Sequence, residues 1–188
     1  PAAVVDTATI DAMTVDAGPG PDARRYLEYR AGFGGNYAYP DRSEIQSFGY
    51  KMAWIAVPTS DRAGLVAQLG LAAAREMPFV DAMDAAYDGV GTMVTPVVDG
   101  WTLVVGAGVL TADLTRLERQ LVELSVEHGE AQAFLTHRYF EYHGYVLARE
   151  GRLVRSYVYD GEAKGVVRDV GARLREETGL PARFDGPG

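Results

Sequence analysis

The sequence predicts an α+β protein with a mostly antiparallel sheet of five or six strands, three or four packed helices and an extended N-terminal arm. Two observations predict hairpins. Asp99-Gly100 and Glu150-Gly151 each separate two apolar runs, and such pairs supply the positive φ that two-residue turns need. A third observation predicts a helix packed on the sheet, because the leucines from Leu114 to Leu124 step by three or four residues.

Composition narrows the class of protein. The chain has 188 residues, 18 Lys+Arg against 26 Asp+Glu, a net charge of −8 and no cysteine. This length favours one domain with an appendage. The negative charge argues against broad nucleic-acid binding, and no apolar run approaches the roughly 20 residues of a membrane span. Without cysteine there are no disulfides, thiol nucleophiles or zinc fingers, while the compartment, cytoplasmic or exported, stays open.

The sequence divides into three parts: 1–22 as an acidic arm or linker, 23–51 as an aromatic- and glycine-rich wrapping segment, and 52–188 as the α+β domain. The first part carries half of the net charge, with four Asp and no base. Its β-branched-Asp pairs recur every five residues, a period that gives neither a strand face nor a helix face. A solvated linker fits this pattern, and so does an arm lying on its own domain or on the sheet edge of a neighbour.

Regular elements are expected from Ala53 onward, each marked by a start or stop signal. The expected order is a strand over 54–57, a helix capped by Thr59-Ser60-Asp61, a helix from Pro78 to Gly89, and strands over 92–98 and 101–106. Asp is a preferred N-cap, and proline fits the first turn of a helix. Pro96 lacks the N–H that a sheet ladder needs, which favours a sheet edge for its strand.

The C-terminal half is expected to continue with a helix, a hairpin and a last helix. The expected order is a helix capped by Thr111 and closed by Gly129, an extended run over 131–149, a partner strand over 152–159 and a helix over roughly 167–178. In that last helix Val170 and Leu174 would share the inward face. A bend near residues 138–140, or a bulge at Gly144, would split the long extended run.

One stretch of the extended run could carry acid-base chemistry. Glu141, His143 and Tyr145 alternate, so on one continuous strand they point to the same face, together with His137 and Tyr139. A carboxylate beside an imidazole with a tyrosine donor is a reasonable general base. Threading the hairpin through Glu150-Gly151 pairs Tyr145 with Ser156 and His143 with Val158. The alternative is a structural histidine that donates to a carboxylate, and a metal site would lack a third ligand.

Aromatic residues predict the leading function. Segments 26–50 and 139–159 are rich in tyrosine, and the expected binding residues are Trp101, Tyr139, Tyr142 and Tyr157. Such surfaces are typical of protein recognition, so we expect a non-catalytic protein-binding or assembly protein. It could be an immunity-type partner of a basic toxin or a subunit of a larger particle, with the arm docking on a neighbour. We expect a protein partner or self-assembly, without nucleic acid, membrane span, cofactor or metal.

An enzyme or small-molecule-binding protein is the alternative function. Its pocket would be lined by Glu141, His143, Tyr145 and Trp101, with His143 as the base and a tyrosine as the donor. Whether Glu141 and His143 reach a common, water-accessible pocket separates this alternative from the binding function.

Several runs resemble a set of uncharacterised bacterial proteins from high-GC organisms. They are Thr95 to Gly106, Thr136-His137-Arg138, Glu141-Tyr142-His143 and Gly151 to Tyr159. The resemblance covers roughly residues 52–162 and leaves the arm unmatched. It implies the boundary of the domain, and it implies no activity, cofactor or catalytic residue.

Overall fold

The computed structural model describes residues 2–6, 45, 48, 51–71, 74–106, 109 and 113–177. Of the segment expected to wrap the domain by its aromatic rings, only Ile45, Phe48 and Lys51 are among them. The expected cap Thr111 and most of the acidic arm lie outside them. In the described part of the chain, no helix is long and apolar enough to cross a membrane.

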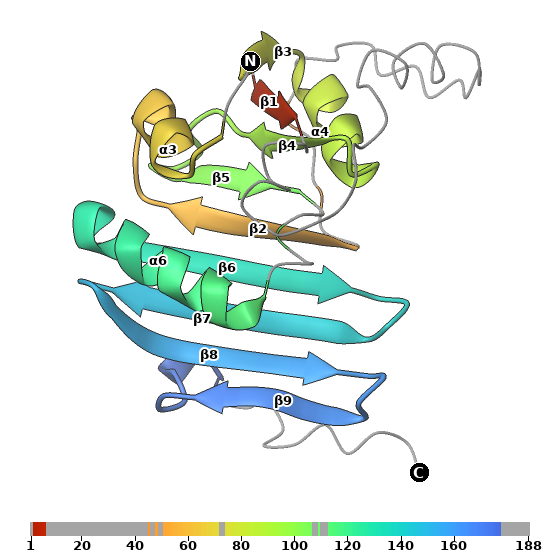
Figure 1. Ribbon diagram of the computed structural model, residues 1–188, viewed down its shortest axis with the longest axis vertical. Coiled ribbons are helices and arrows are strands. Elements are labelled where there is room, and N and C mark those ends of the chain that lie inside the picture. The colour runs from red at the N-terminus through yellow and green to blue at the C-terminus, as the bar shows by residue number, and fades with distance from the viewer. Residues whose placement is uncertain are drawn as a thin grey trace.

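A nine-stranded antiparallel sheet organises the described residues, in the order β3-β1-β4-β5-β2-β6-β7-β8-β9 (Figure 1). The strands are β1 (Ala2–Asp6), β2 (Met52–Val57), β3 (Arg75–Met77), β4 (Gly91–Val94), β5 (Thr102–Val105), β6 (Glu130–His137), β7 (Tyr142–Arg149), β8 (Arg152–Asp160) and β9 (Gly165–Val170). The α+β class is confirmed, but the sheet is larger than the expected five or six strands.

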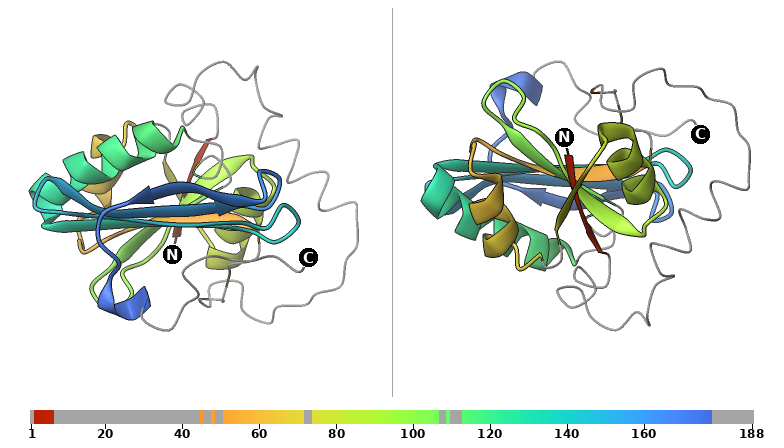
Figure 2. Two further views of the ribbon diagram at one scale, coloured as in Figure 1. Left: turned by 90° about the horizontal axis from the view of Figure 1, so that it is seen from below. Right: turned by 90° about the horizontal axis from the view of Figure 1, so that it is seen from above.

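Among the described residues, three α-helices and one 3-10 turn pack on the two faces of this sheet. They are α3 (Arg62–Gln68), α4 (Phe79–Tyr87), α6 (Leu114–His128) and η1 (Arg175–Glu177). Figure 2 shows α3 and α6 on one face, with α4 and η1 on the other. Leu117, Leu121 and Leu124 of α6 share one core with the α3 residue Leu65 and the inward side chains of β2, β6 and β7. A second core joins α4 to β4 and β5.

The helix starts follow local signals. Asp61 caps α3 by accepting a hydrogen bond from the Gly64 backbone N–H at 2.9 Å. Asp113 caps α6 by accepting from the Thr115 N–H at 2.8 Å, so the cap is not the expected Thr111. Pro78 stands at the N-cap of α4, one position before the first turn.

Both predicted two-residue turns are present. Asp99 and Gly100 have φ of 50° and 83°, and Glu150 and Gly151 have 47° and 74°, as a type I′ turn requires. The edge position expected for the strand before Asp99 is wrong, because β1 pairs with the other side of β4. Pro96 lies beyond the end of β4 and therefore breaks no ladder.

The N-terminal residues form a strand inside the chain's own sheet. β1 pairs antiparallel with β3 on one side and with β4 on the other, with Ala3 opposite Glu76 and Val94. Residues 2–6 therefore belong to the sheet of the domain expected at 52–188, and they dock in cis.

The extended run over 131–149 is two strands. β6 and β7 pair antiparallel with His137 opposite Tyr142, and residues 138–141 form the loop between them. A bulge between β7 and β8 then shifts the next register by one residue, so Tyr145 faces Tyr157 and His143 faces Tyr159. The expected partners Ser156 and Val158 point to the opposite face, because neighbouring strand residues alternate.

The helix expected over 167–178 is wrong. β9 ends at Val170, and Gly171 turns the chain with a φ of 84°. Arg168 reaches Glu118 on α6 at 2.7 Å, whereas the next residue, Asp169, reaches Arg155 on the other face of the sheet. Two neighbouring side chains with partners on opposite faces require a strand.

Candidate functional site

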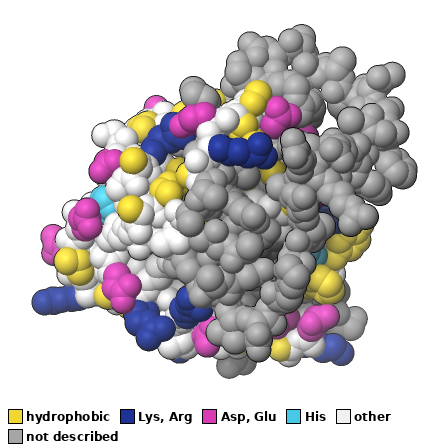
Figure 3. All heavy atoms as spheres, turned by 45° about the horizontal axis from the view of Figure 1, so that its top comes forward, with side chains coloured by type: hydrophobic (Ala, Val, Ile, Leu, Met, Phe, Trp, Pro, Cys, Tyr) yellow, Lys and Arg dark blue, Asp and Glu magenta, His cyan; other side chains and the backbone are white. Residues whose placement is uncertain are grey.

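The loop between β6 and β7 stands at one end of the sheet (Figure 1), and it carries two exposed aromatic rings. We call residues 138–141 the hairpin tip. Tyr139 is 69% exposed and Phe140 is 52% exposed. In Figure 3, hydrophobic side chains and a histidine reach the surface together at the right-hand edge, the side on which Figure 1 places this loop. Adjacent exposed aromatics are uncommon on a surface without a binding role.

The backbone of the hairpin tip is a tight turn. The Phe140 N–H donates to the carbonyl of His137 at 3.2 Å, and Glu141 closes the turn with a φ of 48°. Four-residue hairpin loops of this kind are built on a type I turn and end in a left-handed residue. Because His137 and Tyr142 pair directly below the loop, β6 and β7 hold the hairpin tip in a fixed orientation.

Neighbouring side chains position both exposed rings. The His137 ring stacks on Phe140 with centroids 4.6 Å apart and planes inclined by 26°. The Lys51 ammonium lies 3.9 Å from the centroid of the Tyr139 ring, and the Arg138 guanidinium lies 5.7 Å from it. Such cation-π contacts restrain a ring that water otherwise surrounds. The hairpin tip therefore presents two preorganised rings with cationic neighbours.

His137 also carries an unsatisfied polar atom. Its Nδ1 is buried and has no hydrogen-bond partner among the residues that the structure describes. Leaving a buried ring nitrogen without a partner costs about 1–3 kcal/mol. Stacking on Phe140 holds the ring in place.

The structure does not bring the predicted acid-base residues together. Glu141 lies in the hairpin tip close to Gly161 of the β8–β9 turn. A Cβ added to Gly161 would lie only 3.2 Å from the Glu141 Oε2. His143 is exposed, and its Nδ1 lies 3.2 Å from the Thr136 hydroxyl. No hydrogen bond or ion pair joins Glu141 to His143 in the described part of the chain. The shared face expected for them assumed one continuous strand, which the loop interrupts.

Tyr145 lies in an apolar setting away from Glu141. It is half-buried, and its ring lies 5.1 Å from that of Phe134. Burial raises the pKa of its hydroxyl, and the nearby carboxylate of Glu130 raises it further. A tyrosine with a raised pKa holds its proton more tightly, which suits a packing role better than proton transfer.

Trp101 lies at the far end of the sheet from His143. Along β2, Val57 pairs with Thr102, the residue after Trp101, whereas Met52 stands level with Thr136 and His143. Five residues of strand separate these two levels, or about 17 Å. The pocket expected from Glu141, His143, Tyr145 and Trp101 is therefore not formed.

The four expected binding residues lie on different surfaces. Tyr139 is in the hairpin tip, and Tyr142 packs against the core under α6. Burial and then the charge of Asp160 raise the pKa of Tyr142. Tyr157 is half-buried on the opposite face, with the Arg155 guanidinium 5.3 Å from its ring. Only Tyr139 of these four is largely exposed.

A row of aromatic side chains crosses the sheet on the face opposite α6, and sequence reasoning missed it. Trp54, Phe134, Tyr145 and Tyr157 stand directly opposite one another on β2, β6, β7 and β8. Trp54 stacks on Phe134 at 5.3 Å, and Phe48 meets Trp54 edge-on at 5.4 Å. The bulge that sets the register of Tyr157 has no local sequence signal, so the alignment of these four aromatic residues could not be predicted from the sequence.

Within the described residues, no cluster of three His, Asp or Glu side chains could hold a metal ion. Comparison of the chain with family models, with curated proteins and with solved structures found no match. The resemblance to high-GC bacterial proteins over roughly 52–162 therefore stays a prediction.

Proposed function

We propose that this chain is a non-catalytic protein-binding or assembly protein and that it docks through the hairpin tip. The carrying observation is the pair of exposed, preorganised rings of Tyr139 and Phe140. Aromatic residues are enriched among the anchors that dominate binding energy, and rings already held in place lose little conformational entropy on binding. The enzyme alternative gains no support from the described residues, because its acid, base and tryptophan lie apart.

The side chains around the rings indicate the chemistry of the partner. Lys51 and Arg138 place cations beside Tyr139, so an apolar pocket with an acidic rim would complement the hairpin tip. A basic toxin would meet these cations, which disfavours the immunity-type form of the function at this surface. We favour assembly with another subunit, since a second copy of this acidic chain could supply the acidic rim.

Site-specific photocrosslinking tests the proposal. A benzophenone amino acid replaces Phe140 in one variant and Val126 in a control, because Val126 is an exposed hydrophobic residue on α6. Crosslinking is then carried out in the cells that make the protein. We expect a discrete product, either a dimer of the chain or a heteromer, from position 140 and not from position 126. No product, or equal products from both positions, contradicts docking through the hairpin tip.

A double variant with Tyr139→Ser and Phe140→Ser completes the test. Both side chains are exposed, so the variant should still fold, and loss of the stacking on His137 should cost only about 1 kcal/mol of stability. Truncating two anchors should weaken binding by about 2 kcal/mol or more, which is roughly thirtyfold in the dissociation constant. Val126→Ser removes an equally exposed apolar side chain and should leave binding unchanged.

A further inference from the structure

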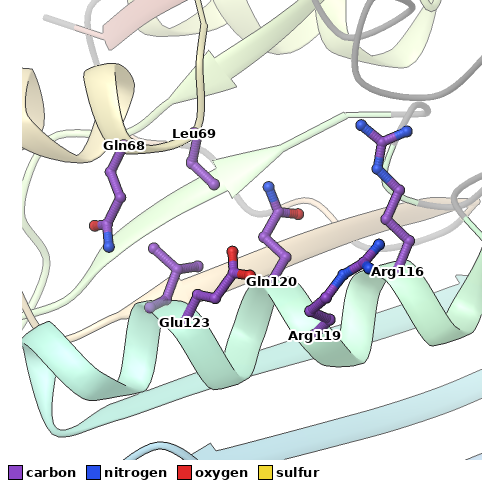
Figure 4. A pocket seen from close by; sticks show the side chains of 7 residues that line it. Gln68, Leu69, Arg116, Arg119, Gln120 and Glu123 are labelled. Atoms are coloured by element: carbon purple, nitrogen blue, oxygen red, sulfur yellow. The ribbon is translucent and has the colours of Figure 1, made fainter.

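A separate groove lies between α3 and α6, on the face of the sheet away from the aromatic row (Figure 4). Its volume is about 250 Å³. The buried side chains of Leu69 and Leu124 contribute its apolar part. This is smaller than the roughly 300–1,000 Å³ of drug-sized pockets, so it suits a ligand of a few heavy atoms.

One polar face of α6 forms most of the groove. Arg116, Arg119, Gln120 and Glu123 follow one another at i, i+3, i+4 and i+7, which places them on one side of a helix. The leucines of the same helix point to the sheet. Figure 4 shows Gln68 extending from α3 at one end of the groove, beside Glu123, and Arg116 at the other end, with Gln120 and Arg119 between them.

The two guanidinium groups form no ion pair within the described residues. Neither Arg116 nor Arg119 has an ion pair or side-chain hydrogen bond with any residue that the structure describes, and Glu123 has none either. Like charges one helical turn apart repel each other. An anion between the two groups would relieve this repulsion, and each planar guanidinium can donate two parallel hydrogen bonds to a carboxylate or phosphate.

Gln68 has one polar end already engaged. The His128 Nε2 lies 3.0 Å from the Gln68 Oε1, and an amide oxygen only accepts, so the ring nitrogen is the donor. This contact leaves the Gln68 NH₂ group as a donor for the groove. The contact with His128 therefore orients a neutral donor at the Glu123 end of the groove.

We propose that this groove binds a small molecule bearing a carboxylate or phosphate group. Arg116 and Arg119 hold the anionic group, and the amide of Gln120 beside Arg119 donates to one of its remaining oxygens. Gln68 lies at the Glu123 end of the groove, where its amide donates to a neutral part of the molecule. Glu123 lies at the other end of the polar face, where it repels a second negative charge. This inference is independent of the hairpin tip and goes beyond the proposed function.

NMR titration of the full chain tests the site, with the Arg Nε–Hε and Gln side-chain signals as the readout. Inorganic phosphate and succinate are the two probes, and sodium chloride at equal ionic strength is the control. We expect saturable shifts of the Arg116 and Arg119 signals with at least one probe. A response to phosphate alone, to succinate alone or to both then identifies the anionic group that the site accepts. Shifts that match those in chloride overturn the proposal.

Four substitutions separate a specific site from general charge attraction. Arg116→Gln and Arg119→Gln should each weaken binding by about tenfold or more, since each removes charge-assisted hydrogen bonds. Arg152→Gln removes the same charge from an exposed position on β8 and should leave the affinity unchanged. Glu123→Gln should tighten phosphate binding. Equal weakening by Arg152→Gln, or weaker phosphate binding in Glu123→Gln, contradicts the proposed arrangement.

Discussion

Replacing Glu177 by Gln should destabilise the protein far more than replacing Asp169 by Asn, although both carboxylates pair with the same guanidinium. Arg155 is 1% exposed, and it donates to Glu177 through Nε at 2.8 Å and Nη2 at 3.0 Å. Its Nη1 donates to Asp169 and to the carbonyls of Val170 and Gly171. The Glu177 side chain is 16% exposed, whereas that of Asp169 is 61% exposed.

These exposures set the expected magnitudes. Breaking a buried ion pair costs about 3–5 kcal/mol. Glu177→Gln keeps the shape and one accepting oxygen, and Asp169 still faces Arg155, so we expect a smaller loss of about 2–3 kcal/mol. Asp169 is well solvated, and Asp169→Asn should cost at most about 1 kcal/mol. For a chain of this length, the first loss lowers the melting temperature by about 5–10 °C.

Urea unfolding at neutral pH measures both losses under the same conditions. The slopes of the unfolding curves should agree among the wild type and both variants, because the same surface is exposed on unfolding. If Asp169→Asn costs as much as Glu177→Gln, burial does not decide the strength of this ion pair and the reasoning is refuted.

Three further predictions concern pH, a turn and the N-terminal strand. Arg155 lowers the pKa of Glu177 below its unfolded value. The stabilisation that the Glu177 carboxylate provides is therefore complete above about pH 4.5 and is lost as pH falls through the folded pKa. The difference in stability between wild type and Glu177→Gln should shrink over that range and stay constant from pH 6 to 8. Gly151→Ala forces a Cβ into a φ of 74° and should cost about 1 kcal/mol by urea unfolding, whereas Gly165→Ala meets no neighbouring atom and should cost less. The double variant Ala3→Cys with Val94→Cys places a cysteine on each of two direct strand partners in a cysteine-free chain. Oxidation should form a disulfide within one chain, which runs as a monomer on a non-reducing gel. A disulfide-linked dimer would contradict pairing in cis.

The candidate site was predicted only in part. Tyr139 was identified as a binding residue because tyrosines are dense in this stretch. A bend near residues 138–140 was one of two ways in which the extended run could be interrupted, and the sequence did not decide between them. Arg138-Tyr139-Phe140-Glu141 contains no glycine, proline, asparagine or aspartate, the residues that usually mark a turn. Stacking of His137 on Phe140 and the pairing of β6 with β7 make the loop, and both depend on residues already brought together. Without the loop, Glu141 and His143 fell on one face by alternation alone.

Local sequence signals determined the turns and helices that use short-range physics. The positive φ at Gly100 and Gly151 and the leucine face of α6 could be predicted because neighbours in the chain provide the cause.

Only the tertiary structure decided the features that depend on distant partners. Residues 2–6 form a strand because β3 and β4 lie on either side of them and supply backbone pairing partners. Residues 165–170 form a strand because the neighbouring side chains of Arg168 and Asp169 pair with Glu118 and Arg155, which lie on opposite faces of the sheet. A bulge beside Leu147 places Tyr157 in the aromatic row. The pairing of residues 2–6 and the contact of Arg168 with Glu118 join residues far apart in the chain, and no local pattern encodes the bulge.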